Sequence, residues 1–276
     1  MLWDASALNS YAIEASDGRI GSARDFLFDD TSWIVRWLVV DTGNWLSGRK
    51  VLLPVSTLGK PDPSLCQFPI KLTMQQVKDS PDIDTDRPVS RQHETHIYNH
   101  YGWDPYWGST FFPMGGGMAM PFIETLPRSG PTPFGAAGEA TQQAKGDPHL
   151  RSAEAVTGFH VHATDGEIGH VEDLLVDDAD WSIRYIKVDT KNLWPGSRVL
   201  ISPRSVRSID RPNRLVHLDV DRQKVEHSPP YDPSKTVDDA YNETFLTYYG
   251  IPGLLKLEAT PQTRFIGPMQ PLEVLG

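Results

Sequence analysis

Apolar residues recur along this chain in short runs separated by turn residues, a pattern typical of β-strands. Residues 11–28 form two such runs around Asp17-Gly18, a dipeptide that suits a tight hairpin because both central residues of a type I′ turn need positive φ. Gly21 lies just inside the second run, where glycine usually marks a bulge or a sharp bend. A second hairpin is predicted over residues 33–55. Five or six short strands with glycine bends in about 70 residues predict a small closed barrel.

The whole pattern occurs twice, and the second copy follows 148 residues after the first. The stretch DGRIGSARDFLFDD at 17–30 returns as DGEIGHVEDLLVDD at 165–178. Further matches are Trp33 with Trp181, Arg36 with Arg184, Asp41 with Asp189, Gly48 with Gly196, Ser80 with Ser228 and Tyr101 with Tyr249. Agreement this dense and this ordered indicates a tandem duplication. We expect the two copies to pack with approximate two-fold symmetry, so that one chain resembles a dimer of barrels.

The run from Trp33 to Val40 is apolar on both faces, with Arg36 as its charged residue. Because the side chains of a strand alternate between its faces, such a strand must be covered on both. We therefore expect its outer face to be covered by a C-terminal helix or by the other repeat.

After its strands, each copy continues with a predicted helical turn and then a short amphipathic helix that ends at glycine. The helices are predicted within residues 90–102 and 236–250, the second with a capping-box-like start at Thr236 and Asp239. Residues between the copies are rich in Gly, Pro and Met and indicate a linker. The predicted segments are a first repeat at 1–104, a flexible linker at 105–150, a second repeat at 151–252 and an extended tail at 253–276.

The two copies resemble PRC-barrel domains. The motifs that carry the resemblance are Asp-Gly-x-Ile-Gly, a strand ending in an acidic turn, and a Trp-led hairpin, each present twice in the same order. The family is named from the cytoplasmic domain of the photosynthetic reaction-centre H subunit and also contains a domain of a ribosome-maturation factor. The resemblance covers about residues 9–104 and 155–250 and implies a mainly β protein of two PRC-type barrels in tandem. It carries no active site across, because a fold does not imply a function.

The charge balance argues against two classes of partner. The net charge is −10 at pH 7, divided evenly between the halves, whereas binders of nucleic acid or of anionic membrane carry basic patches. Cys66 is the one cysteine, which excludes an intramolecular disulfide. No apolar run approaches the ~18 residues of a transmembrane helix, and the first ten residues show no secretory signal. We expect a soluble, cytoplasmic protein.

Three histidines are the strongest metal-like signal. His93, His96 and His100 share one face of the first predicted C-terminal helix, where neutral imidazoles bind zinc, copper or nickel. The second copy has Tyr241, Thr244 and Tyr248 at the equivalent positions, which favours a semi-polar packing face instead. Purified protein without a stoichiometric transition metal would exclude the metal site.

Aspartates recur at strand ends in both copies, namely Asp25, Asp29, Asp30 and Asp41 with Asp173, Asp177, Asp178 and Asp189. Paired carboxylates can bind a hard cation or act as acid and base. Their presence in both copies favours turn chemistry, since aspartate side chains bond nearby backbone amides.

Aromatic residues are dense at the exit of the first copy: Trp103, Tyr106, Trp107, Phe111 and Phe112. An exposed aromatic cluster would anchor a protein partner, while a buried one would cover the first barrel or the seam between repeats.

Together these patterns predict a non-catalytic protein-binding or scaffold module without a cofactor, which binds an unidentified protein partner and neither nucleic acid nor membrane. Homo-oligomers through barrel or helix faces are compatible with it. A photosynthesis-related role rests on the resemblance alone. The alternatives are a metal-binding protein that uses the histidine face and a ribosome- or RNA-associated factor, the latter disfavoured by the charge.

Overall fold

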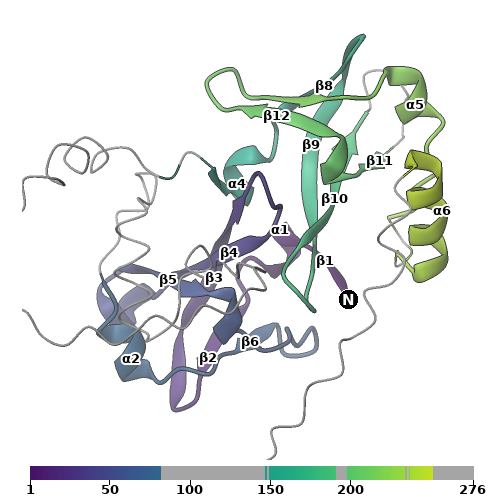
Figure 1. The fold of residues 1–276 in the computed structure, drawn as a ribbon. Coiled ribbons are helices and arrows are strands. Elements are labelled where there is room, and N and C mark those ends of the chain that lie inside the picture. The colour runs from purple at the N-terminus through teal and green to yellow at the C-terminus, as the bar shows by residue number, and fades with distance from the viewer. Residues whose placement is uncertain (82–146, 148, 191–197, 234, 236, 251–276) are drawn as a thin grey trace, which may run out of the picture. The chain divides into compact units, whose positions relative to one another are not determined.

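The computed structural model describes the chain except for residues 82–146, 148, 191–197, 234, 236 and 251–276. By its internal contacts the chain divides into two units, Met1–Asp232 and Pro233–Gly276. The first unit contains the β-sheets of both repeats, one sheet in each (Figure 1). The boundary predicted between the first repeat and the linker lies outside the described residues.

The sheet of the first repeat has the strand order β5-β4-β3-β2-β6. Its strands are β2 (Ala12–Ala15), β3 (Gly18–Asp29), β4 (Val35–Asp41), β5 (Lys50–Pro54) and β6 (Gln67–Pro69). Neighbouring strands from β5 to β2 are antiparallel, whereas β6 runs parallel to β2. The short helices η1 (Gly43–Leu46), η2 (Val55–Thr57) and α2 (Met74–Lys78) complete the repeat.

The sheet of the second repeat has the corresponding order β11-β10-β9-β8-β13-β12. Its strands are β8 (His160–Ala163), β9 (Gly166–Asp177), β10 (Ile183–Asp189), β11 (Arg198–Ile201), β12 (Val206–Asp210) and β13 (Leu215–Leu218). Here too the last strand of the repeat, β13, runs parallel to β8. The short helices are η3 (Pro203–Ser205) and α5 (Arg222–Glu226).

The mainly β class is confirmed, but the predicted closed barrels are not found. Within the described residues each sheet is open, ending at β5 and β6 in the first repeat and at β11 and β12 in the second. Closing the first sheet would require β5 to bond with β6, and these two are joined through η2 and a single bridge between Leu58 and Ile70. A three-residue β6 that already pairs with β2 is too short to complete a ladder on its other edge.

The first hairpin is confirmed, although its turn differs from the predicted one. Ala15 pairs with Gly18, so Ser16 and Asp17 form the turn and Gly18 begins β3. The side chain of Asp17 accepts a hydrogen bond from the amide of Met74, at the start of α2. The Asp-Gly pair is thus used to dock a helix on the hairpin, and Asp165 does the same for α5 in the second repeat.

The glycine bend is confirmed in both repeats. Gly21 and Gly169 have φ of 154° and 147° and lie next to a register shift in their ladders. A Cβ atom at either position would come within 2.1 Å of the carbonyl oxygen of Asp41 or 2.0 Å of that of Asp189. Only glycine permits this close approach, which lets β3 and β9 bend across the whole repeat.

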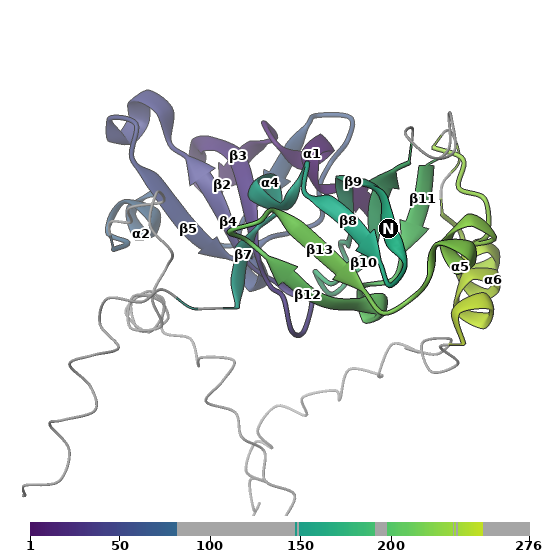
Figure 2. The same cartoon turned by 90° about the horizontal axis from the view of Figure 1, so that it is seen from above.

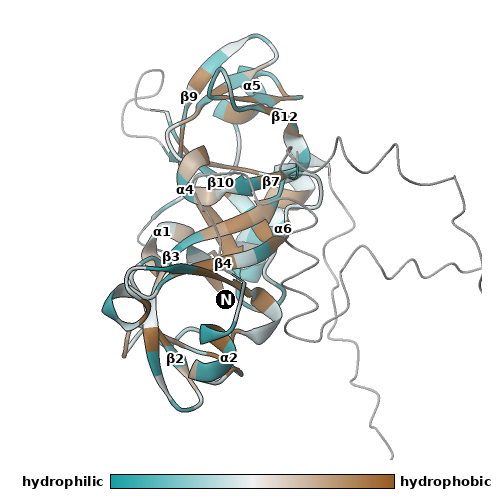
Figure 3. Cartoon of the chain, turned by 90° about the vertical axis from the view of Figure 1, so that its left-hand side faces the viewer, coloured by the Kyte–Doolittle hydropathy of each residue, from teal (hydrophilic) through white to brown (hydrophobic). Residues whose placement is uncertain are grey.

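The core lies mainly along the long central strands of each sheet. Strands β3, β4, β9 and β10 carry extended hydrophobic stretches (Figure 3). Trp37 is the largest fully buried side chain of the first repeat, followed by Phe26, Phe28 and Phe68. Strand β4 is buried along both faces, as its apolar pattern predicted.

The predicted helical turns are also present. Thr73 and Gln76 form a capping box at the start of α2. Helix α6 (Asp239–Tyr249), in the second unit, ends at Gly250 in the left-handed conformation as predicted. Its N-cap is Asp238, whose side chain accepts a hydrogen bond from the amide of Tyr241. The predicted helix over 90–102 lies outside the described residues.

Candidate functional site

Each repeat begins with a short arm that pairs with the sheet of the other repeat. The first arm consists of β1 (Leu2–Asp4) and α1 (Ala5–Leu8), and the second arm of β7 (Leu150–Ser152) and α4 (Ala153–Val156). Strand β1 is antiparallel to β9 of the second repeat, and β7 is antiparallel to β3 of the first. Figure 2 shows the teal β7 beside the purple strands of the first repeat. The arms are therefore exchanged between the repeats.

The exchange is reciprocal down to single hydrogen bonds. The amide of Asp178 donates to the carbonyl of Met1 at 3.0 Å, and the amide of Asp30 donates to the carbonyl of His149 at 2.9 Å. Each bond is the other one shifted by 148 residues. Such pairing, in which residue i contacts j and the equivalent of j contacts the equivalent of i, is the pattern of a two-fold interface.

A second reciprocal contact joins the turns that precede β4 and β10. The amide of Val35 donates to the carbonyl of Trp181, and the amide of Ile183 donates to the carbonyl of Trp33, both at 2.8 Å. The two tryptophans have positive φ, 57° for Trp33 and 58° for Trp181, which turns their carbonyl groups toward the opposite repeat. The conspicuous Trp-Trp match of the repeats is thus part of their interface.

The indole of Trp181 lies in the core of the first repeat. Its ring is 6.1 Å from that of Phe26 and 6.0 Å from that of Phe68, and all three side chains are buried. Trp33 instead stacks on Phe28 of its own repeat, at 5.4 Å. The aromatic contact that crosses the interface is therefore concentrated on Trp181.

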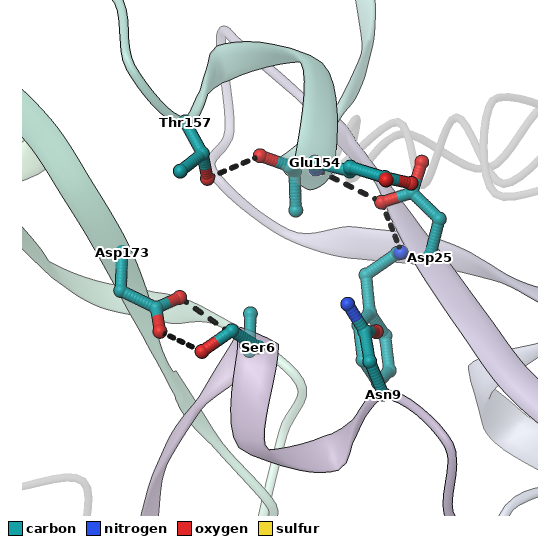
Figure 4. A pocket seen from close by; sticks show the side chains of 9 residues that line it. Ser6, Asn9, Asp25, Glu154, Thr157 and Asp173 are labelled. Atoms are coloured by element: carbon teal, nitrogen blue, oxygen red, sulfur yellow. Dashed lines mark hydrogen bonds between the residues drawn. The ribbon is translucent and has the colours of Figure 1, made fainter.

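A cavity of about 170 Å³ lies where the two arms and the two sheets meet. Its lining consists almost entirely of equivalent pairs: Ala5 with Ala153, Ser6 with Glu154, Asn9 with Thr157, and Asp25 with Asp173, together with Phe26. Figure 4 shows the two aspartates approaching the opposite arms from either side. The cavity thus lies on the approximate two-fold axis of the repeats.

Each cavity aspartate caps the arm helix of the other repeat. The Oδ2 atom of Asp25 accepts a hydrogen bond from the hydroxyl of Ser152 at 2.5 Å, and its Oδ1 atom accepts from the amide of Glu154 at 3.0 Å. Oδ1 also accepts from the amide of Phe26. The carboxylate thereby satisfies the amide of Glu154, one of those that the first turn of α4 leaves without a helical partner.

Asp173 repeats this arrangement in the second sheet. It accepts hydrogen bonds from the amide and the hydroxyl of Ser6 in α1 and from the amide of Leu174. Burial raises the pKa of both aspartates above the ordinary value, although the hydrogen bonds oppose this shift. The polar lining of the cavity is thus engaged in holding the repeats together.

The side-chain amide oxygen of Asn9, Oδ1, is the exception in this lining. It is buried and has no hydrogen-bond partner among the described residues.

The two arms use different side chains at equivalent positions. In the first arm, Trp3 donates from its indole to Asp178 at 3.0 Å. In the second, Arg151 forms an ion pair with Asp30 at 2.5 Å. A carboxylate at the end of each long strand therefore holds the opposite arm, with a neutral donor in one case and a cation in the other.

One pair of equivalent positions differs in charge between the repeats. Asp4 of the first arm pairs with Lys187 of β10, with 2.6 Å between Oδ1 and Nζ, and Lys187 is only 7% exposed. The equivalents of these residues are Ser152 and Val39, which form no such pair. The repeats are thus symmetric in backbone pairing and asymmetric in this buried charge.

The outer face of β4 is buried, as its apolar pattern predicted. Arg36 on this face is buried, and it binds Asp29 of its own sheet and Asp147, just before the second arm. Asp29 also accepts hydrogen bonds from the amides of Thr31 and Ser32, which is the expected turn chemistry.

The predicted metal and interaction sites cannot be compared with this interface. His93, His96, His100 and the aromatic residues Trp103, Tyr106, Trp107, Phe111 and Phe112 lie outside the described residues, so both sites remain predictions. In the part of the chain that the structure describes, no three His, Cys, Asp or Glu side chains are grouped so as to hold a metal ion. No helix in that part is long and apolar enough to cross a membrane.

The arms themselves were missed in the sequence, although a signal was present. The repeat, when extended upstream at the same offset of 148, aligns Leu2 with Leu150 and Ala5 with Ala153. This places the arms inside the duplicated unit, but no local pattern indicates which sheet they join.

The comparisons with known proteins leave the family open. No family model matches the chain. An uncharacterized protein of Deinococcus radiodurans is 36% identical over 74 residues, which are 27% of this chain and 26% of the relative. The chain thus aligns with about a quarter of that relative's length, and the name of the relative gives no activity.

Proposed function

We propose that this chain is a non-catalytic protein-binding scaffold built from two PRC-type repeats. The observation that carries the proposal is the use of the cavity aspartates. Asp25 and Asp173, the buried acidic pair best placed for chemistry, each accept two hydrogen bonds from the opposite arm and one from the next amide of their own strand. A general acid or base must reach a substrate, and these carboxylates are already committed to the fold.

The reciprocal exchange supports a scaffold in a second way. Backbone pairing, a buried tryptophan and buried ion pairs all join the repeats, so the first unit presents both repeats as one particle. A protein partner that contacts both repeats at once meets a preorganised surface, which lowers the entropic cost of binding.

The partner-binding residues we propose are the aromatic cluster after the first repeat: Trp103, Tyr106, Trp107, Phe111 and Phe112. Tryptophan and tyrosine dominate the binding energy of protein interfaces. The acidic net charge favours a protein partner over nucleic acid. A cytoplasmic location and a photosynthesis-related role rest on the sequence pattern and the PRC-barrel resemblance, respectively.

The test is affinity recovery from the native cell with the tagged full-length chain, under normal growth and under stress. The matched variant carries Trp103→Ser and Trp107→Ser, and the control carries Arg24→Ala in an exposed ion pair with Glu154. We expect a defined partner to be recovered with the wild type and the control, and about tenfold less with the variant. Equal recovery with all three chains, or recovery of no partner, would contradict the proposal.

A further inference from the structure

Every contact between the repeats joins chain segments that lie on either side of residues 82–146. The first arm and β3 precede this segment, and the second arm and β9 follow it. The contacts themselves are made by the described residues on the two sides and do not depend on which chain supplies each side. A second copy of this chain carries the same two surfaces.

The interface also distinguishes one repeat from the other. If two first repeats paired, the arm carboxylate of Asp4 would face Val39, because Val39 is the equivalent of Lys187. If two second repeats paired, the ammonium of Lys187 would face Ser152 in place of Asp4. A pair of first repeats removes the cation from Asp4, whose side chain is 35% exposed, and a pair of second repeats removes the direct partner of the buried Lys187. Leaving the buried lysine without Asp4 is strongly unfavourable.

One other side-chain contact discriminates as well: Arg24 pairs with Glu154 of the second arm, and the equivalents of these residues are Glu172 and Ser6. Both side chains of this pair are about half exposed, so it contributes little.

The remaining side-chain contacts do not discriminate between the repeats. Trp3 and Arg151 both donate to the carboxylate that ends the opposite long strand, Asp178 or Asp30, so either arm finds an acceptor on either sheet. The cavity aspartates likewise accept from the backbone amide at equivalent arm positions, Ser6 and Glu154.

Lys187 has a second negative neighbour on its own repeat. Asp173 contributes a weaker attraction that would remain in a pair of second repeats. The direct hydrogen bond is to Asp4, at 2.6 Å, and this contact exists only when a first arm lies on a second sheet.

We propose that the interface is a heterotypic pairing surface, selected by Asp4 and Lys187, that also accepts the complementary repeat of a second copy of this chain. First repeats then pair with second repeats, within one chain or between two chains. Self-pairing of either repeat is suppressed.

The experiment uses the full-length chain with a protease site inserted after Thr125, outside the described residues. The folded protein is cut, and isotopically labelled and unlabelled samples are mixed, unfolded in urea and refolded together. Native mass spectrometry then identifies each pair by the masses of its halves. We expect pairs of one first half with one second half, with labelled and unlabelled halves combined freely.

Two variants test the selector. In the chain with Asp4→Ser and Lys187→Val, each repeat carries the residues of the other at these positions, so selection should be lost and about half of the pairs should be homotypic. In the chain with Asp4→Lys and Lys187→Asp, the charges are reversed but still matched, and heterotypic pairing should be retained. Arg207→Ala, at an exposed position of β12, is the control and should leave partner choice unchanged.

Three results would overturn the proposal. The first is that the wild-type halves separate or re-form no pairs. The second is that the wild-type mixture contains homotypic pairs in random proportion. The third is that the Asp4→Ser/Lys187→Val halves pair strictly heterotypically. If the uncharged variant fails to fold, loss of heterotypic pairing in the reversed-charge variant would overturn the proposal.

Discussion

The two repeats share a backbone and differ where they touch. Both offer an arm to the other's sheet in the same register, and both receive a carbonyl of the other's tryptophan turn. Their side chains at this interface diverge: Trp181 enters the opposite core, while Trp33 stacks within its own repeat. Asp4 and Lys187 form an ion pair on one side, and Ser152 and Val39 stand at the equivalent positions on the other.

This difference indicates which features the fold requires and which are specific to the pair. Features present in both repeats, such as the glycine bend and the capping aspartate, are needed to build each half. Features found in only one of the two repeats cannot be required by the repeat fold, because the other repeat folds without them. We infer that they serve the contact between the unlike halves. The following experiments test that division.

Removing the aromatic side chain that enters the core of the other repeat should have the largest effect. Trp181→Ala deletes contacts with Phe26 and Phe68 and leaves a hole in the first repeat, with an expected cost of about 3–5 kcal/mol. Trp33→Ala serves as the equivalent control, and we expect a smaller loss. Urea unfolding measures both. Equal losses would show that the asymmetry of Trp181 has no energetic meaning.

Substituting the bend glycines should affect both repeats alike. Gly21→Ala and Gly169→Ala place Cβ about 2 Å from a carbonyl oxygen of the neighbouring strand, and each should cost at least about 2 kcal/mol. Gly43→Ala, which has positive φ but open space around it, isolates the backbone strain and should cost less. Thermal unfolding checks this series, and a tolerated change at only one of the two bends would contradict their equivalence.

Removing a capping carboxylate should weaken the interface from either side. Asp173→Ala leaves the amide and hydroxyl of Ser6 without their acceptor, and the expected cost is about 1–3 kcal/mol. In Asp173→Asn, the amide oxygen can still accept from Ser6 and Leu174, so the loss should be smaller. Denaturant titration separates the two variants, and an equal loss in both would assign the effect to the negative charge itself.

The smallest effect is a pH dependence that both repeats should share. Burial raises the pKa of Asp25 and Asp173, so the folded chain holds these protons more tightly than the unfolded chain. Their contribution to stability is fully present below the unfolded pKa and is lost as the pH rises through the raised folded pKa. Asp25→Asn with Asp173→Asn removes this loss, so the variant's stability relative to the wild type should rise between about pH 3 and about pH 7. A relative stability that falls over this range would show that the pKa values are lowered in the folded state.

Local features of the repeat could be predicted from the sequence because they depend on local physics. The hairpins follow from alternating apolar residues, and the bends at Gly21 and Gly169 follow from glycine inside a strand. The Asp17-Gly18 turn was misplaced by one residue, because the aspartate serves the start of α2 as well as the turn. The contact between Asp17 and α2 therefore decides which residues form the turn.

The exchange of arms could not be predicted in the same way. Strand β1 has three residues, too few for a period, and its pairing partner β9 begins 162 residues after the end of β1. Either sheet offers an equivalent edge, so the choice depends on the packing of the whole unit. The predicted barrels failed for a related reason, since sheet closure depends on strand lengths that the apolar pattern does not determine.

Arm exchange is the central claim, and a disulfide tests it most directly. Ser152 lies opposite Leu27 of the first repeat, and antiparallel neighbours have Cα atoms about 4.5–5.5 Å apart, within the range of a disulfide. The equivalent residue in the second arm's own repeat is Leu175. In a Cys66→Ser chain cut after Thr125, Ser152→Cys with Leu27→Cys should link the two halves on a non-reducing gel, and Ser152→Cys with Leu175→Cys should form no bridge. A bridge in the Leu175→Cys chain and none in the Leu27→Cys chain would show that each arm pairs with its own sheet, which contradicts the account.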